Sequence, residues 1–111
     1  MIYEPYAIVV VPFPFTDRAT TKRRPAIVLS QEKHQEQTDH ITLLMVTSAK
    51  HSAWASDHLI EDLDPTGLTS ASIVRQKLFT IDQNLIVKKI GNLSSHDQHI
   101  LRRLLKKHLL V

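Results

Sequence analysis

The chain has 111 residues, which is enough for a single domain (residues 1–111) and too few for two. Its 14 Lys and Arg outnumber 11 Asp and Glu, giving a net charge of +3, far below that of an arginine-rich nucleic-acid binder. The absence of cysteine excludes disulfides, zinc–thiolate sites and a thiol nucleophile. No apolar run is long enough to cross a bilayer. Glu4 and Pro5 stand where a secretory signal would be positively charged, so we expect a cytoplasmic protein.

Short apolar runs predict a series of β-strands. The first, residues 7–15, is apolar almost throughout, and Pro12 and Pro14 suggest that its far end lies at a sheet edge or bends away. Further strands are expected at residues 26–29, 41–47, 54–61, 72–75, 78–81 and 85–90. The polar segment 31–40 fits either a solvated turn or a short exposed helix.

The C-terminal segment has a helical period. Ser95 is placed to cap this helix, with Gln98 three residues later at capping-box spacing. Apolar side chains then fall on one face and basic ones on the other: Ile100, Leu101, Leu104, Leu105 and Leu109 against Arg102, Arg103, Lys106 and Lys107. Short strands followed by one amphipathic helix predict a mainly β fold, a small closed or half-closed barrel with the helix packed on it.

A basic cluster precedes the second strand. Lys22, Arg23 and Arg24 are followed by Pro25, which fixes its own φ and biases Arg24 toward an extended backbone. An arginine donates two parallel hydrogen bonds to phosphate and keeps its charge. Taken alone, however, such a run is more often a solvated loop.

Four segments in order carry a family resemblance: VPFPFTD, KRRPAIVLS, MVTSA and SIVRQKLFTID. They resemble the MazF/PemK toxins of type II toxin–antitoxin pairs, from about Ile8 to Gly91, with a family-like terminal helix. The resemblance implies an SH3-like β-barrel that forms a homodimer and is blocked by a cognate antitoxin. It also implies a metal-independent, cofactor-free endoribonuclease that cleaves single-stranded RNA through the RNA 2′-hydroxyl, leaving a 2′,3′-cyclic phosphate and a 5′-hydroxyl.

By this resemblance, Arg24 and Thr47 are the catalytic pair. Attack by the 2′-oxygen adds negative charge to the phosphate, which a preorganised cation such as Arg24 would stabilise. The hydroxyl of Thr47 could donate to a phosphate oxygen or orient the 2′-hydroxyl. Without the resemblance, a threonine at a strand end indicates only β-propensity.

Other residues are candidates for supporting roles or RNA contact. The supporting candidates are Ser48, His58, Arg75 and Gln76, and the candidates for RNA binding are Thr16, Lys22, Arg23 and Lys77. His58, or His51, would serve as general base, with an ordinary surface histidine as the alternative. Relatives often place a carboxylate shortly after the residue equivalent to Arg75, whereas Gln76 and Lys77 follow here, so the identity of the base stays open.

Further departures from the family concern Tyr6–Ala7, where relatives often have Gly-Asp, and loop 18–21, which lacks a histidine that some relatives carry. The cleavage sequence therefore cannot be transferred from the family. His96 and His99 are one helical turn apart, but no third ligand stands at a recognisable spacing, so no metal site is expected.

Two aromatic residues, Trp54 and Phe79, could stack a nucleobase. The core or a dimer interface is an equal alternative for Trp54 and the preferred one for Phe79, whose neighbours Leu78 and Ile81 are apolar. The basic face of the terminal helix could contact RNA, acidic antitoxin residues or only solvent.

Two alternative functions remain from the sequence. One is a barrel that binds nucleic acid or an antitoxin without turnover. The other is an SH3-type peptide adaptor, which the scarcity of aromatic residues disfavours.

Overall fold

The computed structural model of the protein describes residues 1–13, 22–50 and 53–111. Within these ranges six strands form one antiparallel sheet in the order β4-β5-β3-β2-β1-β6. The strands are β1 (Ala7–Phe13), β2 (Lys22–Val28), β3 (His40–Ser48), β4 (His58–Leu59), β5 (Ser72–Asp82) and β6 (Lys88–Asn92). The helices are α1 (Glu32–Thr38) and α2 (Ser95–His108), with short 3₁₀ helices at Asp64–Thr66 and Gln83–Leu85.

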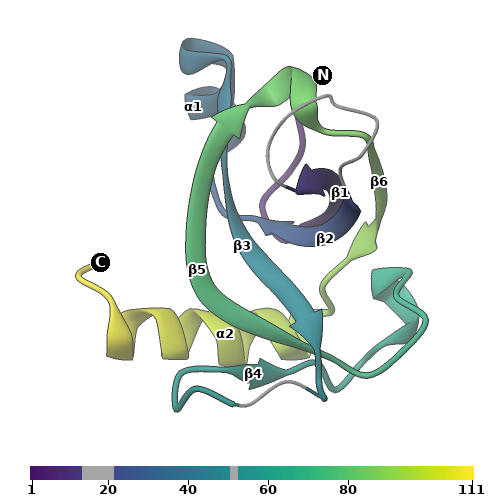
Figure 1. Ribbon diagram of the computed structural model, residues 1–111. Coiled ribbons are helices and arrows are strands. Elements are labelled where there is room, and N and C mark those ends of the chain that lie inside the picture. The colour runs from purple at the N-terminus through teal and green to yellow at the C-terminus, as the bar shows by residue number, and fades with distance from the viewer. Residues whose placement is uncertain (14–21, 51–52) are drawn as a thin grey trace.

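The sheet curls into a half-barrel and buries apolar side chains on both faces, because successive residues of a strand point to opposite sides. Figure 1 shows β3 and β5 curving around β1, β2 and β6, with α2 outside this curl. The cluster inside the curl comprises Tyr3, Ala7, Val9, Val11, Ala26, Val28, Ile41, Leu43 and Ile81. The cluster under α2 comprises Ile8, Ile27, Leu44, Val46, Ile60, Val74, Leu93 and Leu101. The predicted mainly β fold with a C-terminal helix is confirmed.

The basic cluster lies inside a strand rather than in a loop before it. β2 begins at Lys22 and pairs with β1 from Phe13↔Lys22 to Ile8↔Ile27, which is all of the strand except Val28. Its ladder with β3 is shorter and ends at Ala26↔Met45. Pro25, which has no N–H to donate, marks the point where β2 separates from β3.

β5 is continuous where the sequence predicted two strands, residues 72–75 and 78–81. Leu44 pairs with Leu78, and the next residue, Met45, pairs with Arg75. Gln76 and Lys77 are therefore extra residues on β5, which form a β-bulge instead of ending the strand. The two polar residues that interrupt the apolar pattern between residues 72–75 and 78–81 are thus the residues of the bulge.

Two predicted strands are shorter than expected. Residues 54–57 form a turn, in which the N–H of Asp57 donates to the carbonyl of Trp54 at 3.0 Å, so β4 begins only at His58. The predicted strand 85–90 begins at Lys88, because residues 83–85 form a 3₁₀ helix capped by the side chain of Asp82. The polar segment 31–40 contains the short helix α1, one of the two predicted alternatives.

Helix α2 begins one residue earlier than its predicted cap implied. Ser94, not Ser95, is the N-cap, and its Oγ accepts a hydrogen bond from the N–H of Asp97 at 3.1 Å. Leu101 is fully buried between α2 and the sheet. The four residues of the predicted basic face are exposed: Arg102, Arg103, Lys106 and Lys107. Neither α1 nor α2, the α-helices of the described residues, has the length and apolar character that a membrane span requires.

Candidate active site

A cleft of about 280 Å³ opens beside the point where β2 leaves β3. Its described lining comes from four strands: Phe13, Arg24, Met45, Val46, Thr47, Arg75, Lys77 and Phe79. The cleft thus brings together Arg24 and Thr47, which the sequence separates by more than twenty positions, with two further cations.

Strand register explains how Arg24 and Thr47 come to share this cleft. If the β2–β3 ladder continued past Ala26↔Met45 by two residues, Arg24 would stand directly opposite Thr47. The ladder ends first, so the two residues line a gap instead of a hydrogen-bonded pair. Side chains that are two or four positions apart in a strand point to the same face of the sheet. Arg24 is two residues before Ala26 and Thr47 is four residues after Leu43, and both Ala26 and Leu43 belong to the cluster inside the curl. Arg24 and Thr47 therefore lie on the face of that cluster.

The β5 side of the cleft depends on the bulge. Because the bulge adds two residues, Arg75 and Lys77 stay on the same face as Phe79 and Ile81. Gln76 lies between them and is not part of the lining. Its amide nitrogen is buried and has no hydrogen-bond partner in the part of the chain that the structure describes.

Arg75 is held by a carboxylate that sequence reasoning missed. Its Nε and Nη2 donate to Oδ1 and Oδ2 of Asp57 at 3.1 and 2.8 Å, a bidentate pair in which both side chains are largely buried. Oδ2 of Asp57 also accepts from the backbone N–H of Trp54 at 2.7 Å. Asp57 lies in a turn without a periodic pattern, so no sequence signal linked it to Arg75.

The electrostatics of this pair follow from its contacts. Burial raises the pKa of Asp57, but hydrogen bonds from Arg75 and the Trp54 N–H, together with the Arg75 charge, outweigh it and lower the pKa below its ordinary value. The hydrogen bond to Asp57 raises the pKa of Arg75. Asp57 is therefore a fixed anion that orients Arg75, and its low basicity suits it poorly to accept a proton.

Arg24 has a different setting. It is exposed, and its guanidinium makes no hydrogen bond or ion pair within residues 1–13, 22–50 and 53–111. Lys22 and Arg23 are exposed beside it at the start of β2 and are not part of the cleft lining. Thr16, the remaining candidate for RNA contact, lies outside the described residues. Arg24 is thus free to bind an anion, whereas Arg75 is already paired.

His58 is buried and is not part of the described cleft lining. It is 5% exposed, and its Nε2 lies 2.7 Å from Oδ1 of Asp97 on α2. Asp97 also accepts from the backbone N–H groups of Glu61 and Asp62 at 3.0 and 2.9 Å. Burial raises the pKa of Asp97, but these hydrogen bonds outweigh it and lower the pKa. The contacts of His58 therefore connect β4 to α2, and His51, the other candidate base, lies outside the described residues.

Ser48 follows Thr47 at the end of β3 but is not part of the cleft lining. Its Oγ accepts a hydrogen bond from the N–H of Lys50 at 3.2 Å, which shapes the turn after the strand.

The described residues contain no group of three or more His, Asp or Glu placed to hold a metal ion.

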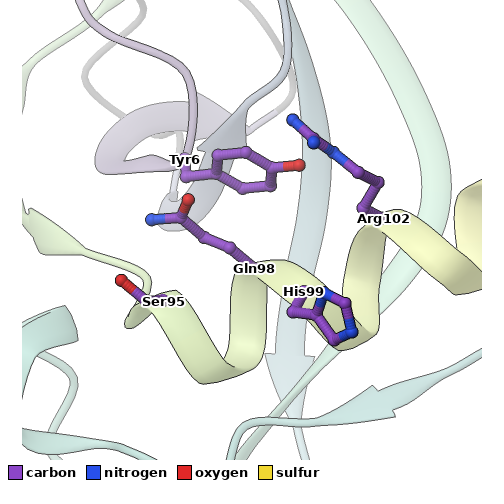
Figure 2. Close-up of a pocket in the computed structure, with 5 residues that line it drawn as sticks. All are labelled: Tyr6, Ser95, Gln98, His99 and Arg102. Carbon is purple, nitrogen blue, oxygen red and sulfur yellow. The ribbon is translucent and has the colours of Figure 1, made fainter.

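A second, polar hollow of about 190 Å³ lies over the start of α2 (Figure 2). Its described lining consists of Tyr6, Ser95, Gln98, His99 and Arg102, none of which belongs to the described lining of the cleft. Tyr6, one of the departures noted from the family, has a left-handed backbone with φ of 68°, a conformation that glycine adopts more readily. Its carbonyl accepts from the N–H of Leu93, which ties the N-terminus to the segment before α2.

Comparison with protein families decides the classification. The family model described as "PemK-like, MazF-like toxin of type II toxin-antitoxin system" matches residues 4–109, nearly the whole chain. The chain belongs to this toxin family. The predicted resemblance to MazF/PemK toxins is confirmed. No curated protein matches the chain by sequence.

Solved structures share the fold at low sequence identity. The Mycobacterium tuberculosis toxin MazF-mt6 is 19% identical with a TM-score of 0.73, over 91% of this chain and 93% of that one. A MazE–MazF structure from Deinococcus radiodurans is 15% identical with a TM-score of 0.73, over 99% of each chain. An endoribonuclease in complex with its cognate antitoxin, from a Mycobacterial species, is 12% identical with a TM-score of 0.73, over 99% of this chain and 97% of that one. At these identities the similarity supports the MazF-like fold alone.

Proposed function

We propose that this toxin is an endoribonuclease that cleaves single-stranded messenger RNA in the cytoplasm, without a metal ion or cofactor. The observation that carries the proposal is that Arg24 and Thr47, from different strands, line one cleft with Arg75 and Lys77. Three cations and a hydroxyl around one cavity match the needs of a phosphodiester whose negative charge increases during the reaction. Family membership supports the same class of activity.

The proposed reaction uses the RNA's own 2′-hydroxyl as nucleophile. The 2′-hydroxyl gives up its proton, and its oxygen forms a bond to the adjacent phosphorus. The bond from phosphorus to the 5′-oxygen of the next nucleotide then breaks, and that oxygen takes up a proton. The products are a 2′,3′-cyclic phosphate and a 5′-hydroxyl.

Each residue of the cleft has a role in this proposal. Arg24, which is unpaired among the described residues, donates to the nonbridging phosphate oxygens as charge develops on them. The Thr47 hydroxyl donates to the same phosphate or orients the 2′-hydroxyl. Arg75, fixed by Asp57, and Lys77 attract and hold the flanking backbone.

One observation favours the second candidate, a barrel that binds RNA or antitoxin without turnover. None of the described lining residues is a carboxylate or a histidine, so none of them is an obvious base. The Arg24→Ala variant separates the two functions. Loss of one cation should weaken RNA binding slightly in either case, but only an enzyme would also lose cleavage, by about 10²–10³-fold.

We also propose a homodimer and a cognate antitoxin as partners. The support is the family itself, described as toxins of type II toxin–antitoxin systems, and the similarity in fold to an endoribonuclease solved in complex with its cognate antitoxin. Leu59 and Leu78, which are 54% and 45% exposed on β4 and β5, offer apolar surface for such partners.

The test is cleavage of a mixed-sequence RNA by the purified protein. Once the cut site is mapped, an oligonucleotide with a single 2′-deoxy nucleotide at that site should resist cleavage, while added EDTA should change nothing. Cleavage at the deoxy nucleotide would overturn the proposed chemistry. Loss of RNA cleavage on addition of EDTA would overturn it as well. In cells, growth arrest should follow expression of the toxin and be relieved by its cognate antitoxin.

A further inference from the structure

We infer that Trp54 is the base-stacking element of the RNA site and holds the nucleobase next to the phosphate at the cleft. This inference rests on the proposed function and deepens it. Trp54 lies in the turn before β4 and is 43% exposed, although it is a large apolar side chain. Bases of single-stranded RNA commonly stack on such exposed aromatic rings.

The position of the indole relative to the cleft carries the argument. Arg75 and Lys77 both lie over the indole ring, with the guanidinium carbon of Arg75 4.8 Å and Nζ of Lys77 5.5 Å from the ring centroid. Both cations line the cleft. The ring is therefore one side chain away from the proposed phosphate site, as the base of a bound nucleotide would need to be.

The ring is also preorganised. The backbone N–H of Trp54 donates to Oδ2 of Asp57, and the same carboxylate holds Arg75 in a bidentate pair. Asp57 thus fixes the backbone of the stacking residue and the cation beside it with one side chain. The ring itself is held by Arg75 and Lys77, which lie over it. It therefore loses little conformational entropy on binding, so more of the stacking energy becomes affinity.

The chemistry of the ligand follows from these contacts. The part of the indole that stays exposed beside these cations accepts any nucleobase, so stacking on Trp54 contributes affinity and placement but little discrimination between bases. The two cations next to the ring attract the phosphate that belongs to the stacked nucleotide. The occupant is therefore a nucleotide of single-stranded RNA that adjoins the cleaved bond.

Trp54 is the only tryptophan in the chain, so intrinsic fluorescence reports on it directly. The probe is a short oligoribonucleotide spanning a mapped cut site, with a 2′-O-methyl group that prevents cleavage. Titration of the protein with this oligonucleotide should quench the tryptophan fluorescence. The Kd obtained from the quenching should equal the Kd obtained from the anisotropy of a labelled copy of the same oligonucleotide. Replacing the nucleotide next to the cut by an abasic unit should abolish most of the quenching.

Variants supply an independent measurement. Trp54→Leu should weaken anisotropy-measured binding by about 5- to 150-fold, the range expected for loss of one base–aromatic stack, and should raise KM more than it lowers kcat. Trp54→Phe should retain most of the affinity. Leu110→Ala, at a fully exposed apolar residue of the C-terminus, is the matched control and should bind as the parent does. Thermal unfolding of each variant verifies that it is folded.

The outcomes separate the inference from the proposed function. Binding without quenching, or a folded Trp54→Leu variant that binds and cleaves normally, would overturn the stacking role and leave the nuclease intact. A protein that never cleaves RNA would overturn the proposed function, whatever the fluorescence shows.

Discussion

The contacts of His58 predict that it is a structural residue and not the general base. The informative change is His58→Gln, which removes the imidazole but keeps a polar side chain. Its partner Asp97 is fully buried and would lose one charge-assisted hydrogen bond, while keeping those from Glu61, Asp62 and Ser94. Loss of such a bond costs about 1.5–3 kcal/mol of unfolding free energy.

For a domain of this length, each kcal/mol lowers Tm by about 4 °C, so His58→Gln should lower Tm by about 6–12 °C. Circular dichroism measures this shift. RNA cleavage per folded molecule, assayed well below the lowered Tm, should stay within about threefold of the parent. A general base contributes about 10²–10⁴-fold. A variant with the parental Tm and a cleavage rate reduced a hundredfold would refute the structural role of His58.

Three further predictions concern the charges of the site and the fold. Asp57→Asn should weaken RNA binding several-fold, because it releases Arg75 from its fixed orientation, and anisotropy titrations would contradict this if Kd stayed unchanged. Lys77→Ala should reduce the slope of log K against log salt concentration by about 1, the signature of one lost phosphate contact, and an unaltered slope would argue against such a contact. The pKa values of Asp57 and Asp97 are lowered in the folded protein, so their stabilisation is present above the ordinary carboxyl pKa and is lost as pH falls below about 4. Denaturant titrations should show no such loss between pH 6 and pH 8, and a loss there would contradict the assignment.

The parts of the fold that the sequence predicted well are those with local, periodic signals. β1, β3 and α2 follow from apolar runs and from a helical stripe, which need no knowledge of distant residues. The bulge of β5 and the short β4 were not anticipated, because their form depends on pairing with β3 and on the turn that Asp57 closes.

The site divides in the same way. The family resemblance selected Arg24 and Thr47, but their shared position in one cleft results from the β2–β3 register and the end of that ladder at Ala26. The partner of His58 lies 39 residues away in sequence, so the burial of this histidine could not be read from its neighbours. Asp57 was overlooked for a similar reason, since its pairing with Arg75 exists only in the folded chain.

The catalytic role of Arg24 is tested most directly by comparing Arg24→Ala with Arg24→Lys and the parent, using end-group analysis of the cleaved RNA. We expect 2′,3′-cyclic phosphate and 5′-hydroxyl ends from the parent, a rate about 10²–10³-fold lower for Arg24→Ala, and partial activity for Arg24→Lys with unchanged Tm. A folded Arg24→Ala variant that cleaves at the parental rate, or products with 5′-phosphate ends, would contradict it.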